Sequence, residues 1–272
     1  MKKILAKIKA FIKKILGKTA ADIIIPVKTV LSWDQCTKSS NWWGANAAHR
    51  AMNVLSPAFS ESKFKEYIKK QKDRGCNYVN LFVTNKGDGE GAGYSIFGSN
   101  FNIKGNVDKK TCELMEKRID YVIDQGMGCV LWMMADDSNA WAKLAQQNWD
   151  KYCKALKDLG WFKKASMIVI GLEIEEYWNN GATVANMIKT LKQYYKGKVG
   201  THHVSDKYAL GAAADVLFVQ MNPGRTDAQI TNYVKKVKGT GKPVCMFELE
   251  RGPDKHRSEV ALKAGAFSIG NW

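Results

Sequence analysis

The sequence lacks the residue patterns that identify metal, disulfide and dinucleotide sites. It has four histidines without an HExxH pattern, and its six cysteines include no CxxC pair, so we expect no metal ion and no disulfide framework. The glycine-rich segment 86–100 does not have the GxGxxG spacing of a dinucleotide-binding turn. We therefore expect no cofactor and favour a reducing compartment. Segment 86–100 is interpreted as a long flexible loop over the site.

Long apolar runs are also missing, which argues against a membrane-spanning helix and against a signal peptide. Acidic residues are scarce: 26 Asp and Glu face 42 Lys and Arg, for a formal net charge of +16. Such an excess can indicate nucleic acid or an anionic surface as partner, or a basic scaffold that binds through charge alone. No nucleic-acid-binding motif is present, so we expect no nucleic-acid partner. We favour a monomer that is cytoplasmic or peripherally membrane-associated.

The charge is concentrated at the start of the chain. Residues 1–18 contain seven lysines and no acid, and their apolar residues recur at the i, i+3/i+4, i+7 spacing of an amphipathic helix. One interpretation is a helix that lies on an anionic membrane or envelope surface. The alternatives are a helix that docks on the rest of the protein and a segment without fixed structure. Residues 19–26 form a linker, and residues 27–272 form the main domain.

The main domain alternates strand-like and helix-like segments. Strands are predicted at residues 27–33, 76–83, 129–134, 167–172, 198–202, 215–219, 244–247 and 266–269. Helices are predicted at residues 61–74, 109–125, 140–159, 182–195, 207–210, 226–238 and 254–264. Eight strands alternating with helices predict a (β/α)8 TIM barrel of the α/β class, preceded by the amphipathic helix. A doubly wound open sheet is the alternative.

Polar and aromatic side chains follow the predicted strands where each strand ends, which is the active-site end of such barrels. Carboxylates and amides can bind sugar hydroxyls, and indole rings can stack on sugar rings. The candidate substrate-binding residues are Trp33, Asn80, Trp132, Glu173, Glu175, Trp178, His202, Gln220, Asn222 and Trp272. We expect Trp33, Trp178 and Trp272 to present partly exposed indole faces to one cleft.

Glutamates end the fourth and seventh predicted strands, in "MIVIGLEIEEYW" (167–178) and "GKPVCMFELE" (241–250). Hydrolysis of a glycosidic bond needs one carboxylic acid to protonate the leaving oxygen and one carboxylate to attack the anomeric carbon. These segments resemble the retaining glycoside hydrolase clan that includes cellulases, β-mannanases and β-galactosidases. The resemblance implies that Glu176 is the general acid/base and Glu248 the nucleophile, acting on a β-linked carbohydrate substrate. Strict alternation along the strand would favour Glu175, which is the alternative acid/base.

The sequence departs from the pattern of this clan at two positions. Asn80 stands where the clan usually has an arginine on the second strand, and Glu175 replaces the asparagine before the acid/base. An alternative function is therefore a catalytically inactive barrel that binds carbohydrate, held at a surface by the N-terminal helix.

Overall fold

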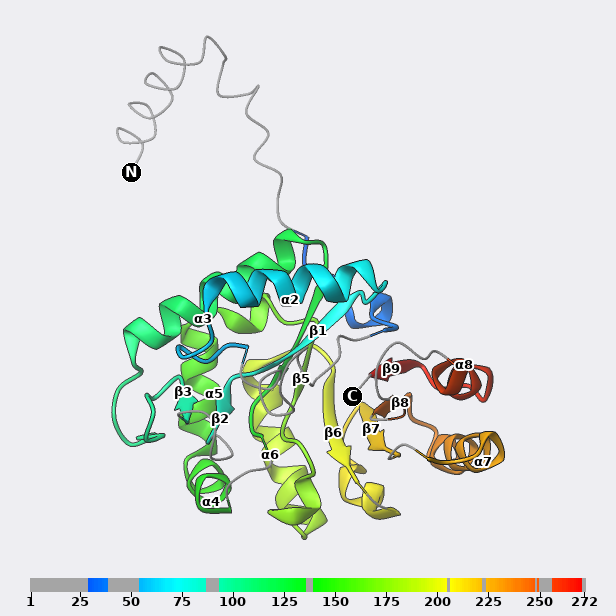
Figure 1. The fold of residues 1–272 in the computed structure, drawn as a ribbon. Helices are drawn as coiled ribbons and strands as arrows, with labels where there is room; N and C mark the ends of the chain where they lie inside the picture. The colour runs from blue at the N-terminus through cyan, green and yellow to red at the C-terminus, as the bar shows by residue number, and fades with distance from the viewer. Residues whose placement is uncertain are drawn as a thin grey trace, which may run out of the picture.

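The computed structural model describes residues 29–38, 54–86, 93–135, 139–204, 206–221, 224–247, 249 and 256–270. The predicted N-terminal helix and linker lie outside these ranges. Seven parallel strands form one curled sheet (Figure 1). Adjacent strands in the sheet follow the order β1 (Tyr78–Phe82), β4 (Gly128–Trp132), β5 (Met167–Val169), β6 (Val199–His203), β7 (Val216–Gln220), β8 (Val244–Phe247) and β9 (Ser268–Gly270). Each of these strands overlaps a predicted strand.

Helices surround the outer face of the curled sheet (Figure 1). They are α2 (Glu61–Asp73), α3 (Lys109–Asp124), α4 (Asn139–Gln147), α5 (Trp149–Asp158), α6 (Gly181–Tyr194), α7 (Asp227–Lys238) and α8 (His256–Lys263). Side-chain caps begin several of them, as Asp108 does for α3 by accepting a hydrogen bond from the backbone N–H of Thr111 at 2.7 Å. The predicted helix 140–159 is divided at Asn148. Within the described ranges, no helix is long and apolar enough to cross a membrane.

The prediction of a first strand at residues 27–33 is wrong for residues 29–33, the part that the structure describes. Residues 29–32 have no regular secondary structure, and a short 3-10 helix, η1 (Trp33–Gln35), follows them. The cause is local, because the Gln35 side chain accepts a hydrogen bond from the backbone N–H of Ser32 at 3.0 Å and turns the chain.

Residues Thr37 and Lys38 occupy the gap between the two edges of the sheet. Ile269 of β9 donates its backbone N–H to the Thr37 carbonyl at 3.2 Å, and Asn77 donates to the Lys38 carbonyl at 2.8 Å. Lys38 also forms a parallel bridge with Ile269. This segment therefore joins β9 to β1, and with it counted first, β5 is the fourth strand and β8 the seventh. We call the ring of strands closed in this way the barrel.

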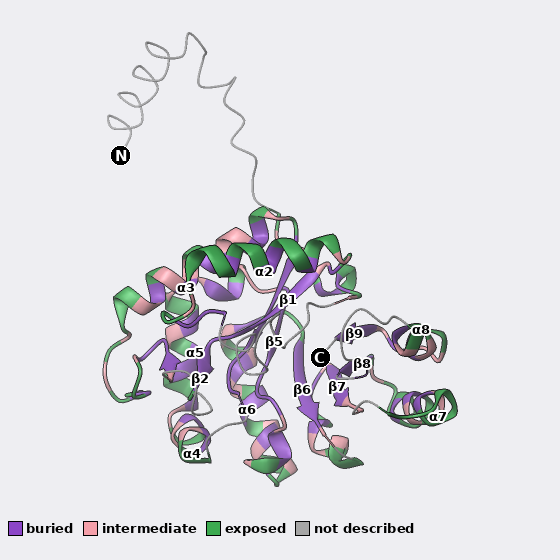
Figure 2. Ribbon diagram, in the orientation of Figure 1, coloured by how far each residue is buried: buried purple, intermediate pink, exposed green. Residues whose placement is uncertain are grey.

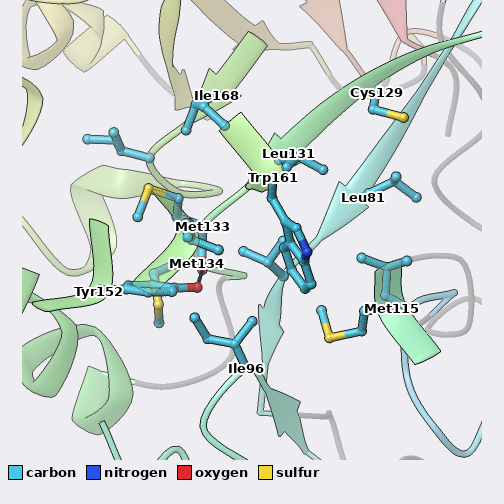
Figure 3. Packing of buried hydrophobic residues seen from close by; sticks show 14 of the residues in the cluster. Leu81, Ile96, Met115, Cys129, Leu131, Met133, Met134, Tyr152, Trp161 and Ile168 are labelled. Carbon is cyan, nitrogen blue, oxygen red and sulfur yellow. Dashed lines mark hydrogen bonds between the residues drawn. The ribbon is translucent and has the colours of Figure 1, made fainter. Parts of the chain in front are cut away.

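Among the described residues, hydrophobic clusters lie on both faces of the sheet, one inside the barrel and two between the strands and the helices. The inner core fills the barrel with side chains such as Tyr78, Val130, Trp132 and Phe218. The outer core lies between the strands and the helices, and Figure 3 shows part of it around Trp161. Strands are therefore buried on both faces, while the outward sides of the helices are exposed (Figure 2).

Trp33 lies at the amino-terminal end of the barrel. Its ring centroid is 5.6 Å from that of Tyr78, which begins β1, and 5.3 Å from that of Phe267, which precedes β9. Only 4% of Trp33 is exposed. The expectation that Trp33 offers an exposed indole face at the carboxyl ends of the strands is therefore wrong, because the first strand begins after it.

The described part of segment 86–100 is packed rather than a loose loop. Strands β2 (Thr84–Asn85) and β3 (Tyr94–Ser95) pair antiparallel, and the hydroxyl of Tyr94 donates to the carbonyl of Phe82 at 2.8 Å. Phe97 is buried in the outer core. Residues 94–97 are therefore buried, and only residues 87–92 of the predicted loop lie outside the described ranges.

We predict that Trp33→Ala lowers the free energy of unfolding by about 3–5 kcal/mol, because it leaves a cavity in a filled barrel end. Denaturant unfolding monitored by circular dichroism measures this loss. Leu262→Ala is the control: Leu262 is 40% exposed, and its truncation should cost less than about 0.5 kcal/mol. An unchanged stability for Trp33→Ala would contradict the structural role of Trp33.

Candidate active site

The carboxyl ends of parallel strands meet at one end of the barrel, which we call the mouth. Ionisable residues lie at the mouth after two strands. Three glutamates follow β5, in and just before the short 3-10 helix η4 (Ile174–Glu176), and β6 ends in His202 and His203. Gln220 ends β7. Enzymes with this architecture carry their catalytic groups here.

Glu173 follows β5 with a left-handed backbone, at φ +48° and ψ +48°. A residue other than glycine adopts this region at a cost, and such strain gathers at functional sites. The backbone N–H of Glu173 donates to Nδ1 of His202 at 3.1 Å. The turn that redirects the chain after β5 is therefore fixed against β6, and Glu173 is half-buried at the mouth.

His202 is fully buried and neutral. Burial, with the neighbouring His203, lowers the pKa of His202 to about 3, although the Glu175 carboxylate opposes this shift. Because Nδ1 accepts the hydrogen bond from Glu173, the neutral ring carries its hydrogen on Nε2. The ring packs edge-on against Trp132, with a centroid separation of 5.6 Å.

Glu175 is buried and held by residues of the neighbouring strand. Its Oε1 accepts the backbone N–H of Val204 at 2.8 Å, and its Oε2 lies 3.5 Å from Nδ1 of His203. Burial alone would raise the pKa of Glu175, but the contacts with His203 and Val204 outweigh it and lower the pKa to about 2. A carboxyl group that stays ionised in this way is poorly suited to donate a proton near neutral pH.

Glu176 differs from Glu175 in exposure. It ends η4 with an exposed side chain, and its backbone N–H donates to the carbonyl of Glu173 at 2.9 Å. The three glutamates of this segment therefore have three environments: Glu173 half-buried, Glu175 buried and paired, and Glu176 exposed.

Below the mouth, Asn80 and Trp132 bond to each other inside the barrel. Nε1 of Trp132 donates to Oδ1 of Asn80 at 2.9 Å. Trp132 also packs against Phe82 and Phe247, with ring centroids 5.3 and 5.8 Å away. Both Asn80 and Trp132 are buried, so they underlie the strand ends rather than offering an exposed face.

Trp178 lies in the outer core. Its ring centroid is 6.1 Å from that of Trp149 on α5, and only 2% of the residue is exposed. The expectation of an exposed Trp178 face is therefore wrong. The remaining predicted site residues, Asn222, Glu248 and Trp272, lie outside the described residues. Glu248 directly follows Phe247, the last residue of β8.

A pocket of about 250 Å³ lies beside the ends of β6 and β7. Its lining includes Gln220 together with Val204, Asp206, Met221, Arg225, Gln229 and Tyr233. Burial and the nearby Asp206 carboxylate raise the pKa of Tyr233, so its hydroxyl keeps its proton. Arg225 and Tyr233 carry no signal of a pocket in the sequence, because Arg225 lies in a loop and Tyr233 at a regular helical position in α7. Among the described residues, no group of three or more His, Cys, Asp or Glu is arranged to hold a metal ion.

Comparison with solved structures finds this fold in glycoside hydrolases. A β-1,4-mannanase of glycoside hydrolase family 113 has a TM-score of 0.57 and 14% identity, over 90% of this chain and 89% of the mannanase. An endo-1,4-β-mannanase from Eisenia fetida has a TM-score of 0.61 and 11% identity, over 87% of this chain and 84% of that one. A β-glycosidase from Pyrococcus horikoshii has a TM-score of 0.52 and 13% identity, over 91% of this chain and 84% of the glycosidase.

No protein-family model matches the sequence, and neither does any curated protein. The structural matches confirm the predicted resemblance to this clan of barrel-shaped glycoside hydrolases at the level of the fold.

We predict that Glu175→Gln destabilises the protein in a pH-dependent way. The folded-state pKa of Glu175 is about 2, below its ordinary value of 4.5, so the carboxylate contributes stability above pH 4.5 and loses it as the pH falls toward 2. The variant should lose about 1–3 kcal/mol of unfolding free energy at neutral pH, and the deficit should shrink between these two pH values. Denaturant unfolding of the variant and the parent protein from pH 7 to pH 2.5 measures this difference in unfolding free energy. A deficit that is constant across this range would contradict the ionised carboxylate of Glu175.

Proposed function

We propose that this protein is a retaining glycoside hydrolase that cleaves β-linked poly- or oligosaccharides. The observation that carries the proposal is the presence of glutamates after β5 and directly after β8, the fourth and seventh strands of a fold that is found in β-mannanases and a β-glycosidase. Two carboxyl groups about 5–5.5 Å apart can carry out double displacement at an anomeric carbon.

The nucleophile in this proposal is Glu248. In the sequence it directly follows Phe247, the last residue of β8, and the carboxyl end of β8 lies at the mouth. The ionised carboxylate attacks the anomeric carbon, and a covalent glycosyl-enzyme forms as the leaving oxygen departs. Water then attacks that intermediate, and the sugar is released with its original anomeric configuration.

For the acid/base, the geometry favours Glu173 over the sequence-based choice, Glu176. Glu173 comes first after the strand, is half-buried, and is fixed by its backbone hydrogen bond to His202 inside the barrel. Glu176 is exposed, and Glu175 is held ionised. In the proposed mechanism Glu173 protonates the leaving oxygen and later takes a proton from the attacking water, while Glu176 is the alternative acid/base.

The pocket beside β6 and β7 is proposed to bind a sugar unit next to the cleaved bond. Gln220 supplies an amide, Arg225 a guanidinium group and Tyr233 a protonated hydroxyl. These are donors and acceptors that match sugar hydroxyls. β-1,4-Mannan is the first polysaccharide to test, because two of the structurally similar enzymes act as β-1,4-mannanases.

A carbohydrate-binding barrel without activity is the second candidate. It is favoured by Asn80, which replaces the arginine expected there and whose Oδ1 accepts a hydrogen bond from Trp132 inside the barrel. The two functions differ in one observable, since an inactive barrel binds the sugar and releases no new reducing ends.

We predict that Glu248→Gln lowers turnover of any polysaccharide substrate by several orders of magnitude, because the amide cannot attack the anomeric carbon. Release of reducing ends from a panel of β-linked polysaccharides measures this effect, with thermal unfolding as a check of folding. Glu259→Gln, on the exposed side of α8, is the matched control and should retain activity. Full activity in Glu248→Gln would exclude this nucleophile.

We predict a second signature for the acid/base in the variants Glu173→Ala, Glu175→Ala and Glu176→Ala. On an aryl glycoside with a good leaving group, the glycosyl-enzyme still forms without a proton donor but is hydrolysed slowly. Azide should restore turnover only in Glu173→Ala and yield a β-glycosyl azide, because this anion needs no general base. Product analysis by chromatography decides among the three. If azide restored turnover only in Glu176→Ala, Glu176 and not Glu173 would be the general acid/base.

A further inference from the structure

We propose that the amino-terminal end of the barrel docks on a lipid bilayer that contains anionic phospholipids. This end is opposite to the mouth, so the proposal does not depend on the proposed function. It concerns the loops that precede the strands, all of which lie within the described residues from β1 to β9.

These loops are strongly basic. They comprise residues 74–77, 125–127, 159–166, 195–198, 212–215, 239–243 and 264–267. Their only acid is Asp215, against six cations: Arg74, Lys163, Lys164, Lys196, Lys198 and Lys242. Because the loops come together at one end of the barrel, their charges add at short range.

Part of this charge is neutralised within the fold. Lys164 lies 2.6 Å from a carboxylate oxygen of Glu116, and Lys192 on α6 lies 2.9 Å from one of Asp215. Lys163, Lys196 and Lys198 are exposed. These three ammonium groups therefore give the end a net positive charge that an anionic surface can attract.

A depression of about 300 Å³ lies within this basic end. It is lined by Lys192, Tyr195, Lys196, Gly197, Lys198 and Asp215. The local acid already pairs with Lys192, and the exposed ammonium group of Lys196 donates to the Lys192 carbonyl at 3.0 Å. Lys196 and Lys198 therefore place positive charge beside the depression without a carboxylate of their own among the described residues, and an ammonium group has further donors for an incoming anion. The headgroup phosphate of a phospholipid is an anion of suitable size and charge.

The start of the chain is attached to this same end. The described chain begins at Thr29, and the buried side chain of Trp33 fixes it beside Tyr78 at the amino-terminal end of the barrel. The preceding residues include segment 1–18, with its seven lysines and its helical spacing of apolar residues. A bilayer is thus favoured over a nucleic acid as partner, because it can accept apolar side chains as well as neutralise lysines.

The opposite end has the opposite charge pattern near β5. Glu173, Glu175 and Glu176 lie there in a single turn, and the Glu176 side chain is exposed. An anionic bilayer is therefore attracted to the amino-terminal end, while the exposed Glu176 gives the mouth near β5 no such attraction. The proposed orientation leaves the mouth facing away from the membrane, accessible to a large substrate.

The test uses the full chain and its variant Lys196→Glu/Lys198→Glu in co-sedimentation with vesicles. One vesicle set contains phosphatidylcholine with phosphatidylglycerol, and the other phosphatidylcholine alone. The matched control is Lys109→Glu/Lys110→Glu, which reverses two exposed lysines at the start of α3, near the mouth. We expect Lys196→Glu/Lys198→Glu to weaken binding to anionic vesicles by about tenfold or more, and the control by much less. Thermal unfolding of both variants checks that they are folded.

Three results would overturn the proposal. Equal weakening by the two double variants would mean that only the net charge matters. Unchanged binding of Lys196→Glu/Lys198→Glu would assign the attachment to other residues. Equally tight binding to a DNA duplex, lost in the same variant, would make nucleic acid the partner of this end.

Discussion

The hydrogen bonds of Thr37 and Lys38 join the two edges of the sheet, and the arrangement of the mouth depends on that connection. β1 and β9 would otherwise present unpaired backbone groups. With residues 37–38 between them, the carboxyl ends of the strands gather around one axis. Glu173, His202 and Gln220 follow or end three neighbouring strands, β5, β6 and β7, so they share this end of the barrel.

Most of the sheet could be predicted from sequence because its strands are buried on both faces. Such strands appear as short apolar runs, and the run at residues 167–172 has no polar residue at all. Helices were equally visible where a side chain caps them, as Asp108 caps α3. The prediction of the first strand was wrong for a local reason. Its apolar residues are typical of a strand, but the hydrogen bond from the Ser32 backbone N–H to the Gln35 side chain turns the chain there.

The site was less predictable because its decisive contacts join residues far apart in sequence. The surroundings of Glu175 depend on His203 and Val204, and no spacing rule reveals such a pair. The directions of the side chains after β5 could not be predicted either, because Glu173 has a left-handed backbone, which breaks the alternation of a strand. Trp178, five residues later, therefore enters the outer core, although its position after a strand suggested the mouth.

The burial of all six cysteines has a practical consequence for spectroscopy. Each is a buried free thiol, and burial raises the pKa of both Cys36 and Cys112 to about 11. Maleimide and methanethiosulfonate reagents react with thiolates that solvent can reach. The native chain should therefore remain unmodified while it is folded, and a single cysteine engineered on its surface would carry a fluorophore or spin label at one known position without removal of any native cysteine.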